Sequence, residues 1–419
     1  MTPGHPSPIG RTLVLVGTAA ALLVGIWFFF PRPSANRGGS PAPSDPTLLA
    51  ASHPDAPKMP KPAAPGEADG SPDEAAQSRT EKKLAGPAEP VTADPELTRA
   101  LEDAFDRIAR GGLSADDIRE ALRRMREAIH AADPAGAAAA IVAFLQSGRD
   151  APTGLAFVVG SEGVLDEAPT WRVALLDWLA QTDPGLASDY SRGFLPGANR
   201  PDEYAIALRN LAWLNVDGTF DAEIATAFSG MLDRPEWLAN PSAGFLEAFD
   251  VAVALGGADL WRQVGSVLKI EGPGGAVPEH PVNRAAFVAL DRLMQREPET
   301  LIGILQETPD WLQWAPRHLT SLLTRLDVRS DAQRDFLRDY LLSGQAPAGE
   351  LEYFATVFPN LNAFVGNRLV SEWEGLRQAP GLDRATLETV SAWMQDPAFA
   401  AVAPHLRVIQ GRLSGPDGQ

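Results

Sequence analysis

Residues 12–30 constrain this chain most strongly, because they form a long apolar run without a charged side chain. The run reads TLVLVGTAAALLVGIWFFF and is followed at once by Pro31. A helix rises about 1.5 Å per residue, so this run would cover roughly 28 Å, close to the thickness of a bilayer's hydrocarbon core. We therefore expect one transmembrane helix over 12–30, with Trp27 and the phenylalanines after it at headgroup level.

A cleaved signal peptide is the alternative interpretation of this run. The apolar core of a signal peptide usually has about 7–15 residues, and this run is longer. The nearest small-residue cleavage site, Pro33-Ser34-Ala35, carries a proline in its first position. These two features favour an anchor that stays attached to the mature protein.

Basic residues flank the anchor almost equally, with Arg11 before it and Arg32 and Arg37 after it. The positive-inside rule therefore does not decide the orientation. Residues 1–11 are too few to fold, and the remaining mass follows the helix. We expect a single-pass protein of the inner (cytoplasmic) membrane, with its N-terminus cytoplasmic and its main domain periplasmic or otherwise extracytoplasmic.

Residues 31–93 differ sharply in composition from the rest of the chain. They are rich in proline, alanine, glycine and serine and contain few large apolar side chains. Such a segment buries too little apolar surface to offset its ordering entropy, so we expect a disordered linker. As a random coil it would span on the order of 45 Å, and its prolines would extend it further.

The formal net charge of −18 and the absence of cysteine exclude several classes of function. Nucleic-acid binding requires a basic surface that displaces counterions from phosphates, so we expect no nucleic-acid partner. A chain without cysteine has no disulfides, thiol nucleophiles or thiolate metal sites. Its acidity is also explained by solubility alone.

Helical periodicity begins at Asp94-Pro95. Apolar residues then recur at spacings of three and four, at Leu97, Leu101, Phe105 and Ile108, which indicates one buried helix face. A second helix is predicted after Ser114, with Asp117 completing a capping box. The apolar face of this second helix comprises Ile118, Leu122, Met125 and Ile129.

Junctions of an acidic or amide residue with proline recur along the rest of the chain. They are Asp133-Pro134, Asp183-Pro184, Asn240-Pro241, Glu297-Pro298 and Asp396-Pro397, mostly about 40 to 57 residues apart. An N-cap followed by proline is typical of a helix start. This pattern resembles HEAT-like arrays, which implies an all-α fold of antiparallel helix pairs stacked as an α-solenoid-like array over 94–414. Turn-rich segments lie at 192–201 and at 271–283, where the array could divide, and 415–419 reads as a disordered tail.

No catalytic motif is present in the sequence. It lacks the nucleophile elbow, the phosphate-binding loop, the dinucleotide fingerprint and the HExxH zinc motif. Neighbouring carboxylates occur at Asp116-Asp117, where the helix dipole explains them. We therefore predict a non-enzymatic protein with no cofactor and no metal site.

The segment TPDWLQWAP brings Trp311 and Trp314 close together between two prolines. Aromatic side chains at the edge of a concave surface can bind a peptide or a sugar, whereas most tryptophans pack in cores. Both core packing and ligand binding are consistent with this pattern. Trp311 and Trp314 are therefore candidate contacts to a ligand or partner.

Residues 334–350, RDFLRDYLLSGQAPAGE, resemble the R-x-x-F-D-Y-x-L-S-A-x-G-E box of membrane-anchored lipase chaperones. Those proteins also combine one N-terminal span, an Ala/Pro-rich tether and a helical domain. The resemblance implies partner contacts at Arg334, Asp339 and Tyr340. Only Asp339-Tyr340 of the Phe-Asp-Tyr run matches, and extra residues separate Ser343 from Gly349. A plain helix capped by Ser330 explains the same residues.

Together these features predict a membrane-tethered scaffold or adaptor that binds a protein or peptide on the extracytoplasmic side. A chaperone or foldase for an exported protein is the first alternative. A cell-wall-acting glycosidase built on a helical superhelix, with one glutamate as acid, is the second.

Overall fold

The structure is a computed structural model that describes residues 92–215, 217–270, 280–307, 316–362, 366–371 and 379–415. The predicted membrane helix, all of the linker but its last residues, and most of the C-terminal tail lie outside these ranges. Within them, no helix combines the length and apolar character needed to cross a membrane. The described residues belong to one unit of contacts, Ala85–Gln419.

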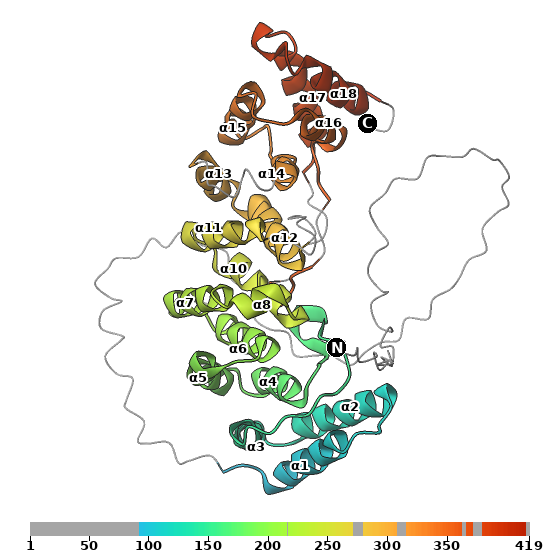
Figure 1. Cartoon of the computed structure of the whole chain (residues 1–419), viewed down its shortest axis with the longest axis vertical. Coiled ribbons are helices and arrows are strands. Elements are labelled where there is room, and N and C mark those ends of the chain that lie inside the picture. Colours follow the sequence, from blue (N-terminus) through green and yellow to red (C-terminus); the bar gives the residue numbers. More distant parts are fainter. Residues whose placement is uncertain are drawn as a thin grey trace, which may run out of the picture. The chain divides into compact units, whose positions relative to one another are not determined.

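The described chain is mostly helical with almost no strand, which confirms the all-α prediction (Figure 1). Its first helices are α1 (Pro95–Ala109), α2 (Ala115–Ala131), α3 (Pro134–Gln146), α4 (Trp171–Thr182), α5 (Pro184–Phe194), α6 (Pro201–Trp213), α7 (Asp221–Leu232), α8 (Pro235–Ala239) and α9 (Ala243–Glu247). The later helices are α10 (Asp250–Leu255), α11 (Ala258–Ser266), α12 (Pro281–Arg296), α13 (Pro298–Gln306), α14 (Pro316–Leu323), α15 (Asp331–Leu342), α16 (Ala348–Val357), α17 (Leu382–Trp393) and α18 (Ala403–Leu413). Short 3₁₀ turns are η1 (Ser161–Gly163), η2 (Leu195–Gly197), η3 (Val267–Lys269) and η6 (Pro397–Phe399).

The predicted caps form at the first three helices. The Asp94 side chain accepts hydrogen bonds from the backbone N–H groups of Glu96 and Leu97 in the first turn of α1. Ser114 and Asp117 form the predicted capping box of α2, each side chain bonding the other's backbone N–H. Asp133 caps α3 by accepting from Gly136 N at 2.9 Å. Because these side chains satisfy otherwise unpaired N–H groups, each helix begins where its sequence predicts.

Two of the predicted junctions differ from the expected helix start. After Asn240-Pro241 the cap is Ser242, and α9 begins only at Ala243. Asp396-Pro397 opens the 3₁₀ turn η6 instead of an α-helix. Part of the predicted loop 192–201 is also helical, since α5 continues to Phe194 and η2 follows it.

Helices pack mainly on the next helix and on the helix two further along the chain. Pairs of the second kind are α1 with α3, α2 with α4, α4 with α6, α10 with α12, α11 with α13, α12 with α14, α13 with α15, α14 with α16 and α16 with α18. Figure 1 shows these helices following one another in chain order. Across the segment 271–283, α11 and η3 pack directly on α12.

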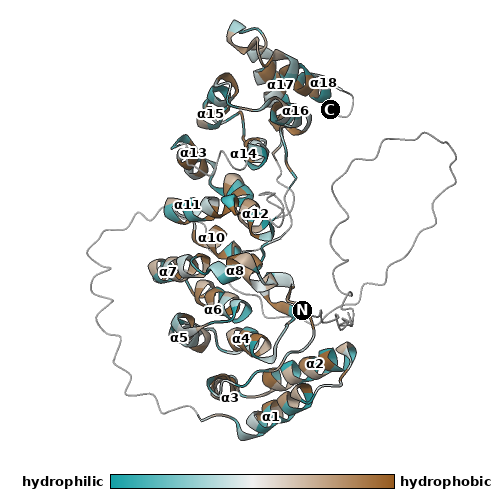
Figure 2. Ribbon diagram, in the orientation of Figure 1, coloured by the Kyte–Doolittle hydropathy of each residue, from teal (hydrophilic) through white to brown (hydrophobic). Residues whose placement is uncertain are grey.

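Helix surfaces differ in how much of them is buried. On α1 the buried residues are the predicted four, Leu97, Leu101, Phe105 and Ile108, so one face is covered. On α4 every residue from Trp171 to Ala180 is buried, because this helix contacts α3, α5 and α6 as well as α2. Figure 2 shows mixed hydrophilic and hydrophobic colouring on the helices, as expected for helices with one covered face.

One short strand pair interrupts the helices. Strand β1 (Val158–Val159) pairs antiparallel with β2 (Leu165–Glu167), with η1 at the turn between them. The sequence did not predict this pair, because runs of two or three residues carry no alternation. It matters for the site, because β2 lies beside α4.

Candidate functional site

A row of buried ion pairs links helices two apart along the chain. Asp177 of α4 pairs with Arg209 of α6 at 2.6 Å. Asp291 of α12 pairs with Arg325 of α14, also at 2.6 Å. A third pair joins α10 to α12, where Asp250 Oδ1 lies 2.5 Å from an Nη of its arginine partner, Arg292. Each charge sits in the middle of an apolar run, as in ALLDWL at 174–179 and LLTRL at 322–326.

These charges are removed from water, and their partners compensate for the lost hydration. Burial lowers the pKa of Arg209, while the carboxylate of Asp177 opposes that effect. Burial raises the pKa of Asp250, while its arginine partner and nearby N–H groups lower it. Breaking such a pair would leave a buried charge without a partner. The pairs therefore fix the register of the two helices that each of them joins.

Residues 360–362 and 366–371, here called the strap, lie against this row of ion pairs. Asp250 Oδ2 accepts hydrogen bonds from Val370 N and Ser371 N, each at 2.7 Å. Arg325 Nη1 donates to Asn360 O at 3.0 Å. The paired charges thus hold the backbone of a segment that lies far from them in sequence.

The strap also approaches η1 closely. An added Cβ at Gly163, which has a φ of +75°, would lie 2.3 Å from Leu369 O. Leu369 itself is fully buried. Glycine is therefore required at this contact, both for the left-handed backbone and for the space.

Glu247 and Asp250 form a pair of carboxyl groups three residues apart beneath the strap. Burial raises the pKa of both groups. A carboxyl group with a raised pKa is the usual form of a general acid. Glu247 Oε2, however, accepts from the strap's Arg368 N at 2.8 Å, and neither carboxyl group lines either cavity described below.

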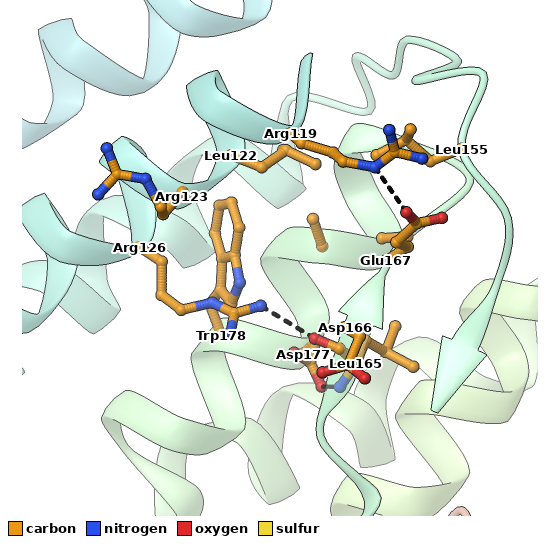
Figure 3. A pocket seen from close by; sticks show the side chains of 12 residues that line it. Arg119, Leu122, Arg123, Arg126, Leu155, Leu165, Asp166, Glu167, Asp177 and Trp178 are labelled. Atoms are coloured by element: carbon orange, nitrogen blue, oxygen red, sulfur yellow. Dashed lines mark hydrogen bonds and ion pairs between the residues drawn. The ribbon is translucent and has the colours of Figure 1, made fainter. Parts of the chain in front are cut away.

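A cavity of about 280 Å³ lies between α2, β2 and α4 (Figure 3). Leu122 and the arginines of α2 form one wall, and Leu165 and Glu167 belong to the β2 wall. Ala174 and Trp178 of α4 form the floor. The remaining lining residues are Leu155, Asp166, Ala168 and Asp177. Small side chains at positions 168 and 174 leave the space open.

Two contacts join α2 to β2 beside this cavity. Arg119 Nε lies 2.7 Å from Glu167 Oε1. Arg126 Nη2 donates to Leu165 O at 2.9 Å. Figure 3 shows these two contacts apart from each other, with the cavity residues between them.

The arginines that line the cavity differ in how their charges are compensated. Arg119 pairs with Asp116 and Glu167, and Arg123 pairs with Glu120 and Glu127. Within the described part of the chain, Arg126 forms no ion pair, although Asp166 and Asp177 line the same cavity. Its guanidinium lies 6.0 Å from the centre of the Trp178 ring, and its Nε is buried without an acceptor.

Two further carboxylates, Asp166 and Asp177, line the cavity. Asp166 turns toward Gly160, where an added Cβ would lie 2.4 Å from its Oδ1. Asp177 is already neutralised by Arg209. The indole N–H of Trp178 bonds to no described residue, so a second donor stands beside Arg126. The cavity therefore offers donors and a positive charge above an apolar floor.

A second hollow, of about 470 Å³, lies between α7 and α11–η3. Its lining includes Ser229, Gln263 and Lys269. Ser229 Oγ and Gln263 Oε1 already bond each other at 2.7 Å. Its charged lining residues, Asp233 and Lys269, are both exposed and opposite in sign.

Of the residues predicted as partner contacts, those that the structure describes lie away from the cavity. Trp311 and Trp314 are outside the described residues. Arg334, Asp339 and Tyr340 lie on α15, whose cap is Ser330 as the plain-helix reading predicts. Arg334 pairs with Asp331 at 2.5 Å, Asp339 is exposed, and burial raises the pKa of Tyr340. None of these α15 residues lines the cavity.

The cavity residues were missed because a row of arginines on a helix usually marks a solvated face. The available signal was the spacing of Arg119, Arg123 and Arg126 on the same side of the helix as Leu122.

Within the described ranges, no three histidine or acidic side chains gather as a metal site would require. Comparison with protein-family models, curated proteins and solved structures finds no match to this chain.

Proposed function

We propose that this chain is a non-enzymatic binding protein, an α-solenoid-like array that holds a protein or peptide partner. The observation that carries the proposal is the cavity between α2 and α4, where Arg126 stands half-buried over Trp178 without an ion-pair partner among the described residues. Half-buried charges are stabilised by partners, and an external acceptor would supply one here. An apolar site with a few convergent polar groups is also the usual form of a ligand pocket.

The strap supports a binding role through its own contacts. Its described residues form neither helix nor strand, and their backbone N–H and C=O groups bond to side chains of the helices. Peptide partners are recognised through the same backbone groups, with side-chain pockets adding specificity. The array therefore has the chemistry needed to bind extended chains.

The membrane helix at 12–30 and the linker at 31–93 complete the proposal. A tethered array would be confined to a layer near the membrane, and its effective concentration there would rise. A fragment that begins at Asp94 should then be soluble, monodisperse and strongly helical by circular dichroism. A substantial strand signal, or loss of folding on removal of 31–93, would contradict this architecture.

Site-specific photocrosslinking in intact membranes tests the binding role. A photoreactive amino acid replaces Arg123, a cavity-lining arginine whose side chain is 55% exposed. The matched control replaces Arg384 of α17, whose side chain is 84% exposed. We expect a discrete crosslinked partner from position 123 and none from position 384. No product at 123, or the same products at both positions, would refute the proposal.

A further inference from the structure

Two contacts bridge the walls of the cavity between α2, β2 and α4. The Arg119–Glu167 ion pair and the Arg126–Leu165 hydrogen bond both bridge α2 and β2, which are the two walls of the cavity. A peptide passing straight between these walls would have to break one of the bridges. A chain terminus can enter without breaking either, so the geometry favours an end of a chain over its middle.

The floor and walls of the cavity select an apolar side chain. Trp178 and Ala174 are each 3% exposed, and Leu122 and Leu155 are each 9% exposed. A space of about 280 Å³ is at the small end for ligand pockets, so it suits a single residue. An aliphatic side chain of leucine size would bury its surface against these four residues.

Donor groups at Arg126 and Trp178 favour an anion beside that side chain. Arg126 donates through Nη2 to Leu165 O and makes no other hydrogen bond to the described residues. Its Nη1 is thus available, and the indole N–H of Trp178 stands on the same cavity. Guanidinium groups bind carboxylates through strong charge-assisted bonds. A carboxylate near Arg126 would give this arginine the ion-pair partner that no described residue supplies.

We propose that the cavity binds the C-terminal residue of a partner peptide. The terminal aliphatic side chain lies on Trp178 and Ala174, and the α-carboxylate pairs with Arg126. Only a C-terminal residue carries a side chain and a free carboxylate on one carbon, which matches the short reach from floor to rim. This inference rests on the proposed binding function and names its ligand.

Fluorescence anisotropy with a defined probe tests the inference on the full chain in detergent micelles. The probe is an N-terminally labelled Ser-Gly-Ser-Gly-Ala-Leu with a free carboxylate. We expect saturable binding that weakens at least about tenfold when the carboxylate is amidated, because a charge-assisted hydrogen bond is lost. A third peptide ends in Leu-Glu and is amidated. It tests whether an acidic side chain can replace the terminal carboxylate.

Variants of the chain provide the matched test. Arg126→Met should weaken the free-acid peptide about tenfold or more and leave the amidated peptide unchanged. Ala174→Leu should abolish binding by filling the cavity. Arg124→Met, two residues away on α2 with a 69% exposed side chain, should leave affinity unchanged. The amidated peptide needs no variant, so the test does not depend on the folding of any substitution.

Several outcomes would overturn the inference. They are equal binding of the free and amidated peptides, preference for the Leu-Glu amide, no binding of any peptide, or equal effects of Arg124→Met and Arg126→Met. If the peptides fail while crosslinking at position 123 captures a partner, the binding function survives and the C-terminal ligand does not. If the free-acid peptide binds but crosslinking captures nothing, the ligand chemistry stands and the proposed function in membranes fails.

Discussion

Neutralising Asp177 should destabilise the helices around it far more than neutralising a surface carboxylate. Asp177 and Arg209 lie 2.6 Å apart with side chains 1% and 0% exposed. Asp177→Asn keeps the shape and an acceptor for Leu165 N but leaves the arginine's charge buried and uncompensated. Removing one partner of a buried pair costs about 3–5 kcal/mol. Two unit charges about 4 Å apart interact by about 4 kcal/mol at an effective dielectric constant near 20, which agrees.

Hydrogen exchange measured by mass spectrometry is the appropriate assay for this prediction. Stacked helices contact mainly their neighbours, so an array opens locally and a single global unfolding energy is poorly defined. A loss of about 3 kcal/mol lowers protection about a hundredfold. We expect that loss in peptides covering α4 and α6, with little change in α17 and α18.

A surface pair provides the control. Glu307 and Arg262 lie 2.6 Å apart, with side chains 54% and 40% exposed. Glu307→Gln should leave protection unchanged within error, because solvent screens exposed pairs. In addition, Asp177→Asn combined with Arg209→Met should cost less than the two changes summed. Equal effects of the buried and surface substitutions, or strict additivity of the double variant, would refute this reasoning.

Three further predictions concern pH, the strap and its closest contact. Burial lowers the pKa of His318 to about 4, against 6.5 when unfolded, so the unfolded state takes up its proton first. The stability of the region around α14 should therefore be full above pH 6.5 and fall by about 3 kcal/mol toward pH 4, measured as hydrogen-exchange protection factors of peptides covering α14. Asp250→Asn removes a charged acceptor of two strap N–H groups, so trypsin should cut after Arg368 about tenfold faster or more. Gly163→Ala forces a left-handed alanine against Leu369 O and should lower the thermal midpoint measurably.

Each of these predictions has a control. His318→Gln should flatten the pH dependence in that window, whereas the same change at exposed His130 should not. Asp259→Asn, at a carboxylate that is 95% exposed, should leave tryptic cleavage of the strap unchanged. Gly349→Ala, where an added Cβ meets nothing within 4 Å, should not lower the midpoint. Matching effects at a site and its control would contradict the corresponding prediction.

Local physical chemistry explains which parts of the fold the sequence predicted. The spacing of three and four from Leu97 to Ile108 could be read from the sequence because one face of α1 is buried and the other is exposed to solvent. The capping box at Ser114 involves residues three apart, so it needs no tertiary information. The two strands β1 and β2 had no such signal, and their pairing depends on packing against α4.

The buried ion pairs were only partly predictable from the sequence. A charged residue inside an apolar run, such as Asp177 or Arg209, must be paired if the run is buried on all sides. The sequence therefore held a signal that such partners exist. It could not name them, since the partner depends on the register between helices two apart. The strap contacts are more remote still, with about 120 residues between Asp250 and Val370.

Arg126 differs from the buried arginines in that it has no carboxylate partner among the described residues. Arg209 and Arg325 are the most deeply buried of these guanidiniums, and each faces a carboxylate of the helix two before it. The array thus compensates the cations that hold its own helices and strap in place. Arg126 donates to a carbonyl and stands over an aromatic face, and it lies on a cavity with room for one more residue. A carboxylate from outside the chain would complete there the same pairing that the array makes internally, and the amidated peptide removes only that charge.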